Sequence, residues 1–289
     1  MTGKILITGA TGKVGSELIK ILVNNGETVR AATRNPFSAG LKIQENVESV
    51  EFDYEQPETF ATALKGIKRV FLVARPGDNQ SDKAAAPFID EMKNNGIQHI
   101  VNLSAMGVET DESFMLRMLE RNIEDSGIPY THLRPNWFMQ NFNSGSMFKG
   151  IQRTDALHLP AGDAKISFID VRDIAAAAAV SLSEPAHAGK AYTLTGGEAL
   201  DHFQVIEKIN RVSGRDISYV PISEETARIL LEKEGIEIDQ IERWTNFFRK
   251  VREGLCAPVS NDIEFITGRP PLLFDQYVND YAHAWKKNM

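Results

Sequence analysis

Three glycines near the start of the chain have a spacing suited to phosphate binding, in the segment Gly9-Ala10-Thr11-Gly12-Lys13-Val14-Gly15. A short apolar run, residues 4–8, precedes them, and a segment of helical period follows, so they lie between a predicted strand and a predicted helix. Gly9 would permit a tight turn, Gly12 would let the backbone approach a pyrophosphate, and Gly15 would let the helix pack on the strand. The helix N-terminus would offer unpaired N–H groups to the phosphates. The alternative interpretation is a glycine-rich turn without a ligand.

The end of the second predicted strand carries a base where an NAD site usually carries an acid. Residues 28–33 form this strand, and Arg34 follows it, about 20 residues past the glycines. A guanidinium suits a 2′-phosphate because it donates forked hydrogen bonds, and Lys13 would add a second positive charge. The sequence therefore favours NADP(H) as cofactor, with NAD possible. A solvated loop arginine is the alternative.

The elements that would position these residues alternate along the first 135 residues. Strands are predicted at 4–8, 28–33, 47–52, 69–73, 99–103 and 130–133, and helices near 57–65, 81–95 and 112–126 as well as after the glycines. This alternation is typical of a parallel sheet with helices on both faces. The sequence therefore predicts an α/β fold with a doubly wound parallel sheet.

The alternation weakens after residue 136. Strands are predicted at 166–169 and 191–194, and helices at 174–182, 202–213, 223–233, 236–252 and 272–285. The five alanines at 175–179 predict a helix packed closely against its neighbours. We expect an NAD(P)-binding Rossmann core over 1–135. Residues 136–289 would form a smaller, mostly helical substrate lobe that is not an independent domain, because its returning strands and helices would pack on the core.

Composition limits the remaining classes. The chain has 289 residues, a formal net charge of −7 and one cysteine, Cys256, which excludes an internal disulfide and a cysteine-rich zinc site. The acidic balance argues against direct nucleic-acid binding, and no apolar run approaches the ~20 residues of a membrane span. The six histidines lack H-x-x-x-H spacing, so no metal site is predicted. We expect a cytoplasmic protein that acts on a small molecule, and the oligomeric state stays open.

Several motifs together resemble a known family. They are Gly9-Ala10-Thr11-Gly12-x-x-Gly15, Thr33-Arg34-Asn35-Pro36, Asp53, the run Ser-Gly-Ile-Pro-Tyr-Thr-His-Leu-Arg-Pro at 126–135, and residues 168–175. This combination resembles the NmrA-like group of atypical short-chain dehydrogenases/reductases. The resemblance implies a Rossmann domain with a smaller C-terminal substrate lobe. Members of the group include NADPH-dependent quinone and dye reductases, and regulators that bind the dinucleotide without turning it over.

The resemblance also implies roles for matching positions. Cofactor contacts would come from Asp53 and Tyr54 by the adenine, Ala74 and Arg75 along the dinucleotide, Ser104 and Ala105 near the nicotinamide ribose, and Asn136 near the nicotinamide. Substrate contacts would come from Met106, Trp137, Phe138 and Asn141, with Met139 and Phe142 completing an apolar wall. Ordinary loop and capping work is the alternative for Asp53, Tyr54 and Ser104. Core packing is the alternative for Trp137 and Phe138.

A catalytic pair common in the wider superfamily is missing. No tyrosine is followed four residues later by lysine, and residues 114–120, where a Tyr-x-x-x-Lys pair should lie, contain neither type. This absence argues against alcohol oxidation and sugar epimerisation by that route, because the tyrosine passes the proton in both. Arg117 and Glu120 in this segment are expected to form a pair on the helix surface.

Three functions therefore remain open. The first is NADPH-dependent hydride transfer to a quinone-like or other aromatic or small carbonyl acceptor, because such an acceptor can take hydride without a dedicated protein acid. The second is a non-catalytic NADP(H)-binding redox sensor that acts on a protein partner. The third, a sugar-nucleotide epimerase-like protein, shares the fold, but fold does not carry function.

Overall fold

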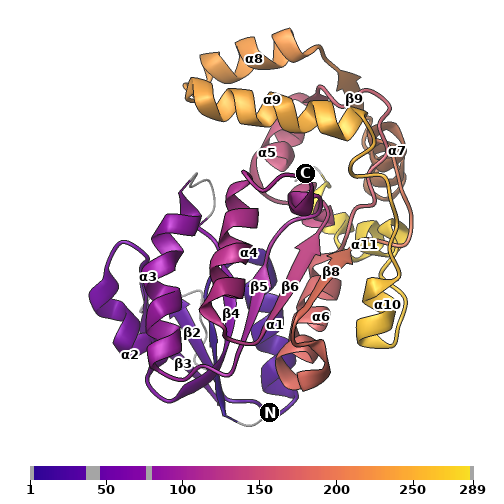
Figure 1. The fold of residues 1–289 in the computed structure, drawn as a ribbon. Helices are drawn as coiled ribbons and strands as arrows, with labels where there is room; N and C mark the ends of the chain where they lie inside the picture. The colour runs from indigo at the N-terminus through magenta and orange to yellow at the C-terminus, as the bar shows by residue number, and fades with distance from the viewer. Residues whose placement is uncertain (1–2, 37–45, 76–79, 287–289) are drawn as a thin grey trace. The chain divides into compact units, whose positions relative to one another are not determined.

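The structure is a computed structural model that describes residues 3–36, 46–75 and 80–286 (Figure 1). The chain divides into two compact units. The first comprises Met1–Pro135, Val171–Leu194 and Asp262–Arg269, and the second comprises Asn136–Asp170, Thr195–Asn261 and Pro270–Met289.

The first unit is built on a parallel sheet of seven strands in the order β3-β2-β1-β4-β5-β6-β8. The strands are β1 (Lys4–Ile7), β2 (Val29–Thr33), β3 (Val47–Glu51), β4 (Ile67–Val73), β5 (His99–Leu103), β6 (Tyr130–Pro135) and β8 (Lys190–Leu194). β1 lies between β2 and β4, so the strand order reverses beside the glycine segment. The predicted doubly wound α/β fold is confirmed.

Helices cover both faces of this sheet (Figure 1). On one face lie α2 (Phe60–Leu64), α3 (Ser81–Asn94) and α4 (Met115–Ser126), whose apolar side chains join one core with β1, β4 and β5. On the other face lie α1 (Lys13–Asn24) and α6 (Val171–Ser183), which pack against each other. Four of the five alanines of α6 are buried, which confirms the close packing predicted for that helix.

The first unit extends beyond the 1–135 core expected from the sequence. β8 pairs with β6 along the sheet edge, and α10 (Asp262–Thr267) packs against α6 and β8. Segments 171–194 and 262–269 therefore belong to the first unit, where the sequence analysis expected strands and helices of residues 136–289 to return and pack on the core. The reason is that strand pairing, and not chain order, decides where these segments lie.

The second unit is mostly helical. Its helices are α5 (Gly145–Thr154), α7 (His202–Ser213), α8 (Glu224–Lys233), α9 (Ile238–Arg252) and α11 (Phe274–Asp280), with short 3₁₀ turns at Met139–Asn141 and Ala282–Ala284. β7 (Ala156–Leu159) and β9 (Ser218–Pro221) form a parallel two-stranded sheet. Within the described residues, no helix is long and apolar enough to span a membrane.

Two predicted elements of the second unit differ in the structure. The predicted strand 166–169 forms only isolated bridges, between Phe138 and Ile169 and between Ile166 and Leu200. The predicted helix 272–285 is interrupted after Asp280 and ends in a 3₁₀ turn. By contrast α7 has the predicted bounds, because Asp201 and Gln204 form a capping box at its start and Gly214 ends it in a left-handed conformation.

Candidate cofactor-binding site

The glycine segment forms a tight loop between β1 and α1. Gly9 has a φ of +61°, in the left-handed region that glycine adopts without strain, and its carbonyl accepts a hydrogen bond of 2.8 Å from the N–H of Gly12. A Cβ atom at Gly12 would lie 3.0 Å from the Gly9 carbonyl oxygen, and one at Gly15 would lie 2.3 Å from it. The loop therefore requires glycine at these positions and brings bare backbone to the end of β1.

The N-terminus of α1 is suited to an anion. Its N-cap residue is Gly12, which has no side chain to cap the helix, and the first turn of α1 carries no acid. The first N–H groups of a helix lack intrahelical partners and lie at its positive end. Thr11 is exposed and Val14 is buried, so the loop presents backbone and the Thr11 side chain outward while Val14 anchors the helix.

The ends of β1 and β4 are tied together beside this loop. The Thr8 hydroxyl donates to the carbonyl of Phe71 at 3.1 Å and accepts the N–H of Val73 at 2.8 Å. A Cβ at Gly9 would lie 3.3 Å from the Val73 side chain. In open parallel sheets, ligands bind outside the carboxyl ends of the strands where the order reverses, and this is that place.

Two cationic residues lie near this loop. Lys13 opens α1 and is partly buried, and burial lowers the pKa of its ammonium group. Arg34 directly follows β2, the strand next to β1, and is exposed. Both positions agree with a role in binding the phosphates of the cofactor, which stays a prediction.

Asp53 and Tyr54, the residues predicted to contact the adenine, already form hydrogen bonds within the protein. The Asp53 carboxylate accepts the N–H of Glu55 at 3.1 Å, which closes a short turn after β3. The Tyr54 hydroxyl donates to the carbonyl of Val73 at 2.9 Å, its ring packs edge-on against Phe52, and burial raises its pKa. The exposed part of each side chain stays available for an adenine contact, but their hydrogen bonds support the structural interpretation.

The residues that follow β4 and β5 line the same edge of the sheet. Ala74 packs against the core, and Arg75 forms an ion pair with Glu55. Ser104 is buried directly after β5, and Ala105 and Met106 are partly buried. Their predicted contacts with the dinucleotide and substrate stay predictions.

In the second unit, the structure uses the polar atoms of Asn136 internally. Its amide donates to the Ser167 hydroxyl at 2.7 Å and to the Cys256 carbonyl at 2.8 Å, and its oxygen accepts the N–H of Trp137. Asn136 is 4% exposed. The Asn136 amide therefore donates both of its hydrogens within the protein, which favours a structural role over the predicted cofactor contact.

The aromatic stretch after Asn136 is packed to different extents. Met139 and Phe142 are completely buried, so the apolar wall proposed for them is wrong, because they belong to the core of the unit. Trp137 is partly exposed and stacks on Phe247, with ring centroids 5.5 Å apart. Phe138 and Asn141 are also partly exposed and stay candidates for substrate contact.

Sequence reasoning missed a charged network between α4 and β6. Its members are three acids and three arginines: Glu112, Glu120, Glu124, Arg117, Arg121 and Arg134. Arg117 and Glu120 do pair, at 2.8 Å, but the predicted location on the helix surface is wrong: Glu120 is 0% exposed and Arg117 is 7% exposed. This side of α4 faces the sheet, where Arg134 also binds the Glu120 carboxylate.

The network keeps Glu120 ionised. Burial raises the pKa of Glu120, but hydrogen bonds from Arg134 and Arg117 more than offset it, so the pKa lies below its usual value. Burial lowers the pKa of the neighbouring His132 to about 4, so this imidazole is neutral at pH 7. At neutral pH the Glu120 carboxyl therefore carries no proton to donate, and the His132 ring carries no positive charge.

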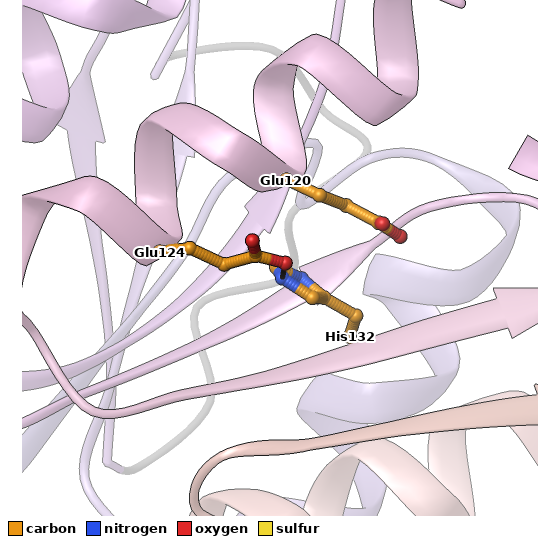
Figure 2. A group of neighbouring side chains, drawn as sticks. All are labelled: Glu120, Glu124 and His132. Atoms are coloured by element: carbon orange, nitrogen blue, oxygen red, sulfur yellow. Dashed lines mark ion pairs between the residues drawn. The ribbon is translucent and has the colours of Figure 1, made fainter. Parts of the chain in front are cut away.

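Figure 2 shows Glu120 and Glu124 of α4 beside His132 of β6, with one ligand atom from each within 4.8 Å of the others. The sequence did not indicate that His132 has carboxylate neighbours, because only the packing of helix on sheet brings them together. Such a trio has the donor types of a metal site. However, Arg117 and Arg134 bind the Glu120 carboxylate, and Arg117 and Arg121 bind that of Glu124. These guanidinium groups already neutralise the two carboxylates and oppose the binding of a dication, and the absence of a metal site stays a prediction.

The lone cysteine has no role at this site. Cys256 is 2% exposed, and burial raises the pKa of its thiol to about 12. A thiol that stays protonated is a poor nucleophile, so the prediction of a packing residue is confirmed.

The fold and the glycine loop define a Rossmann-type dinucleotide-binding protein. A profile of the NmrA-like family matches residues 1–267, and the chain belongs to this family. An NAD(P)H azoreductase of Xenophilus azovorans is 29% identical over 285 residues, covering 97% of this chain and 99% of the relative. A (4-alkanoyl-5-oxo-2,5-dihydrofuran-3-yl)methyl phosphate reductase of Streptomyces griseus is 32% identical over 291 residues, covering 97% of this chain and 99% of the relative.

A solved structure is similar over nearly the whole chain. It is that of the NADPH-dependent quinone oxidoreductase of Escherichia coli complexed with NADPH, with a TM-score of 0.82 and 26% identity. The match covers 96% of this chain and 99% of that one. The similarity therefore extends through both units and is not limited to the Rossmann core.

Proposed function

We propose that this protein is an NADPH-dependent reductase that transfers hydride to a quinone-like or other aromatic or small carbonyl acceptor. The chain is an NAD(P)H-dependent oxidoreductase, and its relatives include an NAD(P)H azoreductase and a (4-alkanoyl-5-oxo-2,5-dihydrofuran-3-yl)methyl phosphate reductase over nearly their whole length. One observation carries the proposal: the loop from Gly9 to Gly15 brings bare backbone and an uncapped helix N-terminus to the point where the strand order reverses.

The residues present fit the cofactor. The backbone of the loop and the first N–H groups of α1 would hold the pyrophosphate, since a Cβ at Gly12 or Gly15 would fill the space against Gly9. Lys13 and Arg34 would bind the 2′-phosphate, which favours NADPH over NADH. Ser104 and Ala105 would border the nicotinamide ribose. When bound, the nicotinamide supplies the hydride, and the protein positions it.

The absence of a protein acid limits the acceptor. The sheet-facing side of α4 carries Arg117 and Glu120 in place of a tyrosine and a lysine, and the paired Glu120 carboxylate holds no proton at neutral pH. An acceptor that needs a proton from the protein during hydride transfer is therefore disfavoured. Quinones and azo dyes fit better, because solvent can protonate the reduced product.

The test is NADPH oxidation by purified protein with separate panels of quinones, azo dyes and simple aldehydes. We expect turnover with at least one of these acceptors, and faster turnover with quinones or azo dyes than with simple aldehydes. A failure of every acceptor, with NADPH binding intact, would contradict the reductase proposal.

One observation favours the redox sensor as a second candidate. Met139 and Phe142 are core residues, and Trp137 stacks on Phe247, so much of the aromatic stretch predicted to contact substrate is packed inside the second unit. A sensor would bind NADP⁺ tightly, would turn over none of the acceptors, and would bind a protein partner differently with oxidised and reduced cofactor. Equal partner binding with and without cofactor would count against it.

A further inference from the structure

Helix α4 contacts β6 through two pairs of polar side chains that match in spacing. Glu120 and Glu124 are four residues apart on the helix, a rise of about 6 Å. Arg134 and His132 are two residues apart on the strand, about 6.6 Å. The helix and the strand that follows it run in opposite directions, so Glu120 meets Arg134 and Glu124 meets His132. The first pair is bidentate, at 2.9 and 2.8 Å, and the second is looser, at 3.5 Å.

The end of β6 around Arg134 contacts the segment that follows β5 through both backbone and side-chain groups. Backbone hydrogen bonds continue past the strands, from Ser104 N–H to the carbonyl of Leu133 at 2.7 Å and from Met106 N–H to that of Pro135 at 3.0 Å. The guanidinium also lies 3.5 Å from Glu109, just beyond the turn at Gly107, whose φ is +85°. Arg134 lies in the strand between Leu133 and Pro135, the residues that accept these two backbone bonds, and its side chain reaches Glu109 at the far end of the segment. Glu120 therefore fixes the Arg134 side chain at this point.

These contacts lie in the second half of the nucleotide-binding fold. A dinucleotide spans both halves of such a sheet, one mononucleotide to each, across the point where the strand order reverses. The glycine loop and Arg34 belong to the half formed by β1–β3, while Ser104, Met106 and Arg134 belong to that formed by β4–β6. A change at Glu120 therefore affects the nicotinamide half and leaves the adenine half in place.

We infer that Glu120 is a positioning residue: through Arg134 it holds the segment Ser104–Met106 in the conformation that receives the nicotinamide end of the cofactor. The inference rests on the proposed cofactor binding. Glu120 itself is completely buried, so a cofactor bound at the surface would not touch it. Its carboxylate is held by two arginines, so removing its charge leaves Arg134 without its only buried acidic partner among the described residues.

Two nucleotides separate this role from general stabilisation. NADPH carries both halves, while 2′,5′-ADP carries the adenine half and the 2′-phosphate but lacks the nicotinamide. For Glu120→Gln we expect about tenfold weaker NADPH binding, and 2′,5′-ADP binding within about twofold of the wild type, because misplacing one part of a site costs only the contacts made there. Calorimetry or fluorescence titration measures both without turnover.

Glu124→Gln is the matched control, since it removes the neighbouring charge of the same helix face beside His132. It should leave both affinities unchanged, even where it lowers the melting temperature as much as Glu120→Gln. If Glu120→Gln folds poorly, Arg134→Lys tests the same contact, because lysine keeps the charge but cannot donate the fork. It should also weaken NADPH selectively.

The outcomes are distinct. Selective loss of NADPH affinity in Glu120→Gln or Arg134→Lys supports the inference. Equal loss for both nucleotides, or no loss for either, overturns it while the proposed cofactor role stands. A wild-type protein that binds neither nucleotide overturns the proposed function and this inference together.

Discussion

Gly15 leaves room for the carbonyl oxygen of Gly9, which would lie only 2.3 Å from a Cβ atom at position 15. The atom in the way is backbone, so it cannot move aside as the end of a flexible side chain could. The contact couples the start of α1 to the end of β1, the two elements that flank the glycine loop.

Gly15→Ala should therefore disrupt this loop. We expect NADPH binding to weaken by at least tenfold and the melting temperature to fall, because the helix must shift away from Gly9. Gly150→Ala is the matched control: Gly150 lies in α5, and a Cβ atom there would have no atom of the described residues outside its own helix turn within 4 Å. That change should be neutral or stabilising by up to about 1 kcal/mol. Unchanged NADPH affinity in Gly15→Ala would contradict the proposed loop function.

Arg34 should set the preference for NADPH. Removing its guanidinium by Arg34→Ser should lower the ratio of kcat/KM for NADPH to that for NADH by about 10- to 100-fold, the contribution of a charged hydrogen bond of about 1.5–3 kcal/mol. Arg153→Ser is the control, since Arg153 is exposed on α5 in the second unit. A ratio that stays constant in Arg34→Ser would show that Arg34 is an ordinary loop residue.

Three buried histidines predict a loss of stability in mild acid. Burial lowers the pKa of His99, His132 and His202 from 6.5 to about 4 each. The unfolded chain therefore binds protons below about pH 6.5 that the folded chain does not bind until about pH 4. The free energy of unfolding should be highest above pH 6.5 and fall towards pH 4, by on the order of 3 kcal/mol per histidine at most. Urea unfolding at several pH values measures this slope.

His202 allows the slope to be tested at one position. Neither of its ring nitrogens has a hydrogen-bond partner among the described residues, and it lies among the rings of Trp137, Phe168 and Tyr219. His202→Leu should reduce the loss of stability between pH 6.5 and 4 without lowering stability at pH 7, because a buried unsatisfied group is removed. His158→Gln, at an exposed site, should leave the slope unchanged. If the free energy of unfolding of His202→Leu falls with pH as steeply as that of the wild type, His202 does not contribute to the loss of stability in acid.

Cys256 should be inert in the folded protein. With a thiol pKa of about 12 and 2% exposure, it should resist a chromogenic disulfide reagent at pH 8 and react stoichiometrically after denaturation. NADPH oxidation should be insensitive to the reagent over the same period. Rapid labelling of the native protein would show that the second unit opens around Cys256.

Local patterns account for the parts of this protein that were predicted correctly. The glycine loop, the alternating strands and helices, and the capped helix α7 each depend on residues close in sequence, so spacing and residue type are enough to identify them.

The role of a polar side chain was harder to predict. Asn136 follows β6 where a cofactor contact would lie, but Ser167 and Cys256, 31 and 120 residues away in sequence, take its amide hydrogens. Nothing in the residues around Asn136 signals these partners. The strand predicted at 166–169 fails for a related reason, because a strand needs a neighbour to pair with and the fold supplies only single bridges there.

The sequence by itself determined the doubly wound sheet, the place of the glycine loop and the absence of a Tyr-x-x-x-Lys pair, since each depends on residues close together in the sequence. Only the tertiary structure decided that Arg117 and Glu120 are buried and that Glu120 pairs with Arg134. The physical reason is that the two faces of α4 differ in what they contact. A charged pair at helical spacing lies in water or against a sheet according to how the helix packs, and long-range packing sets that choice.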